Sequence, residues 1–432
     1  MKIKAAATNT PARSERPVAW WRLLGPGLIT GAADDDPSGI ATYSQAGAQF
    51  GANLAWTIVL TYPLMVAIQF ASARIGRVTG RGMCDNFIAL YPSPVVYGLV
   101  ALLTLANVIN LGADLNAMGD AVRLVVGGPA SLYACVFGLT SLGLLIFMPY
   151  RRYVNILKWL TLSLFAYVGV VFSVHINWHS VMRDAVMPTL SDSKQYITTV
   201  VAVFGTTISP YLFFWQADQE VEEIRRIPRD QPLRRAPQQA GQQLHRLRLD
   251  TAVGMGISNL IALFIMLATT ATLHAHGVTN IETTTQAASA LKPIAGNVAF
   301  LLFALGIIGT GLLALPVLAG SAAFAISSIF HWKKGLYLAP SRGIPFYTVI
   351  GLAILCGIAI SVVEIDPIKA LYWSAVINAV IAVPIMAAVM HVASNIKRMG
   401  PLVLPAGWRA LGWGATLIMA AAALAMFAAM LA

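Results

Sequence analysis

Long apolar runs, separated by short polar segments, cover almost the whole chain. A helix needs roughly 20 residues to cross a hydrocarbon layer of roughly 30 Å, and eleven runs reach or approach that length. They are approximately Leu24–Gln49, Trp56–Ala71, Val96–Val122, Ala130–Met148, Trp159–Val174, Ile197–Trp215, Thr251–Leu273, Ala295–Phe330, Pro345–Val363, Ala370–Val392 and Leu411–Leu431. Hydrocarbon cannot satisfy free backbone amides, so helices are the expected form. The pattern predicts an all-α polytopic membrane protein with about 11 transmembrane helices.

Two of these runs, the first and the sixth, carry a polar interruption that contains a proline. The first reads Asp34-Asp35-Asp36-Pro37-Ser38-Gly39 and the sixth reads Thr206-Thr207-Ile208-Ser209-Pro210-Tyr211. Proline has no amide hydrogen and clashes with the preceding turn, so we expect helix breaks at Pro37 and Pro210. Breaks at corresponding positions in two five-helix halves indicate a LeuT-type 5+5 inverted repeat, with the substrate site at the breaks.

This pattern also divides the chain. We expect a cytoplasmic N-terminal tail over residues 1–21, which lacks the apolar segment and cleavage site of a signal peptide. The transporter core is expected over residues 22–400, with one repeat at about 22–190 and the other at about 191–400. Residues 401–432 would add one further transmembrane helix.

Composition agrees with a membrane protein and explains the charge. Apolar residues make up 57% of the 432 and charged residues 11%, and the mean hydropathy is +0.70. The net charge is +11, but 24 of the 29 Lys and Arg residues fall in segments on one side of the predicted membrane. That distribution follows the positive-inside rule and sets the N-terminus in the cytoplasm. The basicity is therefore topological and does not indicate a nucleic-acid partner.

The one long polar stretch, Gln216 to Asp250, contains seven arginines. It is expected to end a helix and continue as a solvated cytoplasmic loop. A contact between its arginines and lipid headgroups is the alternative.

Three consecutive aspartates inside an apolar helix are costly unless they face water or a cation. Asp36 is the best candidate ligand, because it precedes Pro37, where backbone carbonyls such as that of Ala33 lose their helical partners. Asp34 and Asp35 could line the approach to the ion, bind it through water or be protonated.

A second intramembrane carboxylate lies on the third predicted helix. Asn107, Asn110 and Asp114 share one face by their three-and-four spacing. Such a polar stripe either joins helices through hydrogen bonds or forms an ion or proton pathway, and the sequence leaves both open.

Other chemistries have no support in the sequence. The three cysteines are isolated in apolar stretches, and histidine is absent from both interruptions. No P-loop, nucleophile elbow or zincin motif occurs. We therefore expect neither an enzyme nor an ATP-driven pump, and no cofactor apart from the transported ion.

These residues resemble the NRAMP divalent metal transporters. The resemblance rests on Gly25-Pro-Gly-Leu-Ile, Asp36-Pro-Ser-Gly39, Gln45-Ala-Gly, Phe50-Gly, Ala73-Arg-Ile-Gly76 and Val78-Thr-Gly-Arg81, and it extends to about residue 395. In that family the first break reads Asp-Pro-Gly-Asn and the sixth reads Met-Pro-His. The resemblance assigns Ala33, Asp35, Asp36, Gly39, Thr206 and Ser209 to the substrate site, and Asn110, Asp114, Tyr211 and Gln216 to an ion or proton pathway.

The departures from the family pattern all remove ligands that bind soft metal ions. Ser209 stands at the methionine position, Tyr211 and Gln216 at histidine positions, and Ala117 at the position of a glutamate. Losing sulfur and imidazole favours hard, partly hydrated ions bound by oxygen. The chain is thus similar to the NRAMP-related magnesium transporters.

The expected function is secondary transport of Mg²⁺ or Mn²⁺, with Fe²⁺ less favoured, across the bacterial inner membrane, and proton coupling is in question. Its partners would be the lipid bilayer, divalent metal ions and, as a further candidate, protons. An amino-acid transporter of the same fold is the alternative, although three aspartates would repel a substrate carboxylate. A third hypothesis is a membrane receptor that has this fold but does not transport a substrate.

Overall fold

The computed structural model describes residues 25–148, 152, 159–363 and 366–431. This part of the chain is helical throughout and contains no strand. The helices of the first half are α1 (Pro26–Asp34), α2 (Pro37–Phe50), α3 (Ala55–Thr79), α4 (Met83–Ile88), α5 (Ser93–Val126), α6 (Ala130–Phe147), α8 (Phe165–Ser173) and α9 (Trp178–Val186). The expected N-terminal tail, residues 1–21, lies outside the described residues.

The second half begins with a second broken pair. Its helices are α10 (Lys194–Thr207), α11 (Pro210–Arg226), α12 (Ala240–Thr272), α13 (Thr284–Ser289), α14 (Lys292–Ala295), α15 (Ala299–Ile329), α16 (Ile344–Ser361), α17 (Pro367–Ser394), α18 (Ile396–Met399) and α19 (Ala406–Leu431). Short 3-10 turns occupy Gly51–Leu54, Leu160–Leu164, Pro237–Gln239, His274–His276, Gly296–Val298, Pro340–Arg342 and Gly400–Leu402.

By length and composition, nine helical segments of the described chain could cross a membrane, or ten if the bent pair Leu162–Ser173 and Trp178–Val186 is one span. The sequence predicts eleven. The count is lower because Pro37–Thr79 forms one apolar run that contains parts of the first two predicted helices. Apart from the two breaks and a few residues at their ends, the predicted runs are nevertheless helical where they are described.

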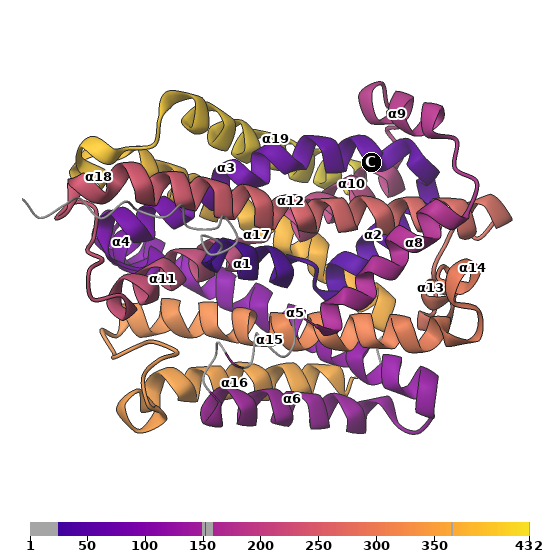
Figure 1. Cartoon of the computed structure of the whole chain (residues 1–432), viewed down its shortest axis with the longest axis horizontal. Coiled ribbons are helices and arrows are strands. Elements are labelled where there is room, and N and C mark those ends of the chain that lie inside the picture. Colours follow the sequence, from indigo (N-terminus) through magenta and orange to yellow (C-terminus); the bar gives the residue numbers. More distant parts are fainter. Residues whose placement is uncertain (1–24, 149–151, 153–158, 364–365, 432) are drawn as a thin grey trace, which may run out of the picture.

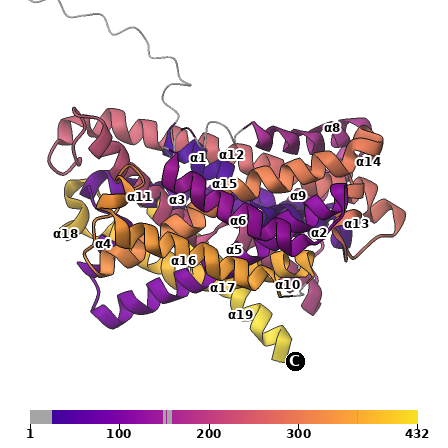
Figure 2. The ribbon, with the colours of Figure 1, turned by 90° about the horizontal axis from the view of Figure 1, so that it is seen from below.

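The long helices lie roughly along one axis (Figure 1). One end lies at α4 and α18, where Arg398 contacts Asn86 and Lys334 contacts Asp85, and we call it the basic end. The other lies at α9, α13 and α14, and we call it the opposite end. Helices α6 and α16 form an outer layer against α5 and α15, as the second view also shows (Figure 2).

Both predicted breaks are confirmed. Asp36 has extended backbone (φ −70°, ψ 170°) and Pro37 begins α2, while Ser209 is extended (φ −83°, ψ 130°) and Pro210 begins α11. Half-helices α1 and α11 point toward the basic end, and α2 and α10 toward the opposite end, so the breaks meet midway along the molecule (Figure 1). This is the arrangement of a LeuT-type inverted repeat.

The polar stretch from Gln216 to Asp250 differs from the expected loop. Helix α11 continues to Arg226 and α12 begins at Ala240, so only a short segment is irregular. The helices extend because their charged side chains are paired: the Glu220 carboxylate is buried and accepts a 2.8 Å hydrogen bond from Arg246. Arg77, also buried, pairs with Asp230.

Helix α1 packs against α12 with almost no side chain between the backbones. A Cβ atom on Gly31 would lie 2.3 Å from the carbonyl oxygen of Gly254, and one on Gly254 would lie 2.3 Å from that of Gly27. Both distances are far shorter than a real Cβ contact, so glycine is required here. The Asp250 carboxylate of α12 accepts hydrogen bonds from the amides of Gly25, Gly27 and Leu28 at 2.8, 2.8 and 3.1 Å, which satisfies the free N-terminus of α1.

Candidate functional site

The first break brings a buried carboxylate to the start of a helix. One oxygen of Asp36 accepts hydrogen bonds from the Gly39 amide at 2.9 Å and from the Ser38 hydroxyl at 2.6 Å. Asp36 is thus the N-cap of α2, a position where an acidic side chain satisfies free amides and faces the positive end of the helix dipole.

The second oxygen of Asp36 joins two further helices. It accepts hydrogen bonds from the Asn110 side-chain amide of α5 and from the Tyr211 hydroxyl of α11, both at 3.1 Å. The same hydroxyl lies 3.3 Å from the carbonyl oxygen of Ala33, at the end of α1. Both breaks and α5 therefore converge on this carboxylate, which is only 1% exposed.

Asp34 and Asp35 form hydrogen bonds with a residue outside the Asp36 group. The Ser258 hydroxyl of α12 lies 2.7 Å from Asp34 and 2.9 Å from Asp35, so the two carboxylates share one hydroxyl. The remaining oxygen of Asp34 is buried and has no hydrogen-bond partner. Ser258 was not predicted, and nothing in its local sequence distinguishes it from a serine that packs in a helix.

The three residues of the polar stripe on α5 have different surroundings. The Asn107 amide donates to the Leu318 carbonyl at 2.9 Å and to the Ser321 hydroxyl at 2.7 Å, so it joins α5 to α15. Asn110 instead reaches Asp36. Asp114, one turn further, is fully buried, neither of its oxygens has a partner, and it is close enough to Asp36 for their charges to interact.

Hydroxyl groups line the second break. Thr206 Oγ1 lies 3.4 Å from the Ser38 hydroxyl, which ties the two breaks together. The Ser209 hydroxyl donates to the carbonyls of Gly205 and Thr206 at 2.9 and 3.0 Å, so its contacts lie within its own break. Gln216 donates to Thr251 of α12 at 2.9 Å and has no hydrogen bond to the Asp36 group.

Of the predicted site residues, hydrogen bonds thus join Ala33, Asp36, Gly39, Asn110 and Tyr211 into one group. Thr206 is linked to it through Ser38, which was not among the predicted residues, and Ser209 donates to the Thr206 carbonyl within the second break. Asp35 and Gln216 make their hydrogen bonds elsewhere. Asn378 of α17 is a further buried side chain whose oxygen and nitrogen both lack a partner.

The site contains negative charge without a protein counter-charge. None of the four buried aspartates, Asp34, Asp35, Asp36 and Asp114, is in an ion pair with a described residue. Buried carboxylates need a cation, protonation or strong hydrogen bonds. The described residues contain no cluster of three His, Cys, Asp or Glu suited to a metal ion. An ion bound at Asp36 would therefore rely, besides that carboxylate, on amide, hydroxyl and carbonyl oxygens and on water.

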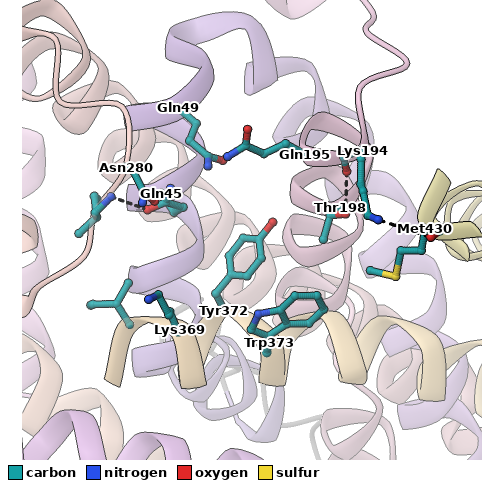
Figure 3. A pocket seen from close by; sticks show the side chains of 12 residues that line it. Gln45, Gln49, Lys194, Gln195, Thr198, Asn280, Lys369, Tyr372, Trp373 and Met430 are labelled. Carbon is teal, nitrogen blue, oxygen red and sulfur yellow. Dashed lines mark hydrogen bonds between the residues drawn. The ribbon is translucent and has the colours of Figure 1, made fainter. Parts of the chain in front are cut away.

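A cavity of about 350 Å³ opens at the opposite end between α2, α10 and α17 (Figure 3). Gln45, which accepts from the Ile281 amide at 2.9 Å and donates to Asn280 at 3.0 Å, fixes one wall. A separate void around Ile40, Ser44 and Leu371 has a volume of only about 10 Å³, about the space of one water molecule. Asp36 itself is only 1% exposed, so solvent scarcely reaches it in this structure.

Replacing Tyr211 by Phe removes the hydroxyl that donates to Asp36 and leaves the ring that fills the site. We expect binding of the preferred divalent ion to weaken by about tenfold, the usual effect of losing one hydrogen bond to a charged group. Calorimetric titration of the purified protein measures this. Tyr97→Phe on exposed α5 surface is the matched control, and equal affinities of the two variants would show that Tyr211 does not support the site.

Comparison with known proteins gives a consistent result. The profile of the Nramp family, natural resistance-associated macrophage protein-like, matches residues 27–429. The chain is 26% identical over 417 residues to the divalent metal cation transporter MntH of Klebsiella pneumoniae, covering 94% of this chain and 93% of that one. It is also 26% identical over 353 residues to MntH of Aeromonas hydrophila, covering 78% and 81%.

A solved structure shares the fold. The crystal structure of the Eremococcus coleocola manganese transporter in complex with an aromatic bis-isothiourea substituted compound superposes with a TM-score of 0.75 at 17% identity. The match covers 96% of this chain and 88% of that one. The helical architecture and its order along the chain are therefore those of a solved transporter.

Proposed function

Because the chain belongs to the Nramp family, a family of multi-pass membrane transporters, we propose that it carries divalent metal cations across the bacterial inner membrane by alternating access. The observation that carries this proposal is the group of four buried aspartates without a protein cation. The printed names of the relatives, a divalent metal cation transporter and a manganese transporter, support the same substrate class. The amino-acid alternative is not favoured, since these charges would repel a carboxylate.

Within this class we propose Mg²⁺ or Mn²⁺ as cargo. Asp36 would supply the charged ligand, with the carbonyls of Ala33 and Thr206, the oxygen of Asn110 and the hydroxyl of Ser209 around it. Mg²⁺ gives up its water reluctantly and is usually bound by one or two carboxylates together with water. An oxygen-only site with few charged ligands suits that behaviour better than it suits soft ions.

We further propose that the basic end faces the cytoplasm, in accord with the positive-inside rule. Ions would then approach through the cavity at the opposite end and leave past α1. Asp114, close to Asp36 but without a partner, is the candidate for a proton or second-ion site.

Purified protein in liposomes, supplied with a panel of divalent ions, tests the function. We expect uptake of Mg²⁺ and Mn²⁺ above protein-free vesicles. Imposed proton gradients in the same vesicles separate coupled from uncoupled transport. Saturable binding of an amino acid with no response to any divalent ion would reject the proposal.

Replacing Ser209 by Met tests the preference for hard ions. A thioether favours borderline and soft ions and offers a hard ion little, so the ratio of Cd²⁺ to Mg²⁺ affinity should rise by roughly tenfold, about 1.4 kcal/mol. Competition of Mg²⁺, Mn²⁺ and Cd²⁺ against a labelled ion measures it. Ser289→Met, at the end of α13, is the matched control. A wild type that already strongly prefers Cd²⁺ would show that Ser209 does not set hardness.

A further inference from the structure

A second cavity, of about 300 Å³, lies at the basic end between α3, α12 and α19. Its wall contains three basic side chains, Arg74, His245 and Arg248, and two aromatic ones, Phe70 and Trp408. No acidic residue of the described chain lines it. It is separate from the Asp36 group and has no part in the function proposed above.

The charges of this cavity are not cancelled. Within the described chain, no carboxylate forms an ion pair with Arg74, His245 or Arg248. His245 and Arg248 lie one turn apart on α12, with 3.5 Å between Nδ1 and Nη2. Both side chains are exposed, so an anion can reach them.

Arg74 is held in place rather than neutralised. Its Nε and Nη2 donate to the carbonyls of Leu402 and Val403 at 2.9 and 3.0 Å, and its guanidinium carbon lies 5.8 Å from the centre of the Phe70 ring. Carbonyls orient a guanidinium but leave its positive charge, and a fixed arginine loses little entropy when it binds an anion. Arg74 therefore provides a rigid cationic wall.

The aromatic wall is typical of a membrane interface. The rings of Phe70 and Trp408 are 5.1 Å apart, and tryptophan is enriched at the level of the lipid headgroups. Helix α19 begins beside the cavity with no acidic residue in its first turn. Exposed Leu249 and Leu411 on the flanking helices present apolar surface next to the basic groups.

We propose that this cavity binds the phosphate group of an anionic lipid in the leaflet at the basic end. Basic cavities between the ends of membrane helices suit such headgroups, and arginine matches phosphate geometry well. The adjoining apolar surface would accept acyl chains, which a soluble phosphate does not have.

Native mass spectrometry of the purified full-length protein tests this with added phosphatidylglycerol, with phosphatidylcholine for comparison. The double variant His245→Gln/Arg248→Gln leaves Arg74 and its packing intact. Its matched control is His276→Gln/Arg235→Gln, which removes the same two side-chain types from exposed positions outside the cavity. We expect wild type and control to retain phosphatidylglycerol in preference to phosphatidylcholine, and the cavity variant to bind it more weakly by a factor on the order of ten.

Three outcomes are informative. Equal retention by all three proteins would overturn the proposal. Displacement of the bound lipid by millimolar inorganic phosphate would support a phosphate site but overturn its assignment to lipid. Loss confined to the cavity variant, with no displacement by phosphate, supports the lipid site. The readout requires no transport, so its failure is distinguishable from failure of the metal-transport proposal.

Discussion

Uptake of divalent metal ions is expected to disappear when Asp36 is replaced by Ala. This carboxylate is where α2, α5 and α11 meet, and it accepts hydrogen bonds from Ser38, Gly39, Asn110 and Tyr211. Removing it takes away the charge that an ion would bind and leaves four donors without their acceptor. The carboxylate and the bound ion would form a buried charged pair. Removing one partner of such a pair lowers affinity, and with it the uptake rate, by a factor on the order of a hundred or more. Initial uptake rates in liposomes provide the measurement.

The control for this experiment is Asp184→Ala, which removes the same charge from α9 near the opposite end, far along the chain from either break. The thermal unfolding midpoint of each variant must also be measured, because Asp36 caps a helix and its loss costs about 1 kcal/mol of stability. Uptake like wild type in a folded Asp36→Ala protein would mean that the ion binds elsewhere.

The second large effect is expected for Gly254→Ala. A single added methyl group would lie 2.3 Å from the Gly27 carbonyl oxygen and 2.8 Å from its carbon. Backbone cannot rotate away as a flexible side chain can, so α1 must shift from α12. Overpacking of this kind costs about 1–3 kcal/mol or more, and the shift would also lengthen the hydrogen bonds from Asp250 to α1. We expect a lower unfolding midpoint and faster hydrogen exchange at Gly25, Gly27 and Leu28.

Replacing glycine by alanine is expected to raise stability, and not lower it, at another position of the same protein. At Gly143, in α6, nothing apart from the neighbouring residues and the backbone of its own helix lies within 4 Å of the position that a Cβ would take. There, Gly143→Ala should raise stability by about 0.5–1 kcal/mol through helix propensity alone. If the two variants change stability in the same direction, close contact between α1 and α12 does not constrain Gly254.

The helix breaks could be predicted from the sequence because their cause is local. Asp36 with Pro37, and Ser209 with Pro210, disfavour a continuous helix within a few residues of the sequence. Pro63 and Pro316 show the limit of the rule, because both lie inside continuous helices, α3 and α15. The acidic and hydroxyl neighbours of the two breaks distinguished them from these kinks.

The partners of the aspartates could not be predicted in the same way. Ser258 reaches Asp34 across 224 positions of sequence and Asp250 reaches Gly25 across 225. Such pairs depend on how α1 packs against α12, and a single serine or aspartate carries no local signal of it. The polar loop was overestimated for the same reason, since the pairing of Arg246 with Glu220 keeps both helices regular.

The cavity at the opposite end has a kinetic consequence. Lys194 and Lys369 line it, and no Asp or Glu of the described chain does, although Lys369 Nζ lies 3.8 Å from Asp366. Under the proposed direction of transport, a divalent cation diffuses toward two positive charges, so its association rate is reduced rather than enhanced by long-range forces. Added salt screens those charges, and the Debye screening length is about 8 Å at physiological ionic strength. Capture of the ion therefore becomes faster as the medium becomes saltier, whereas a cavity lined with carboxylates would lose its attraction.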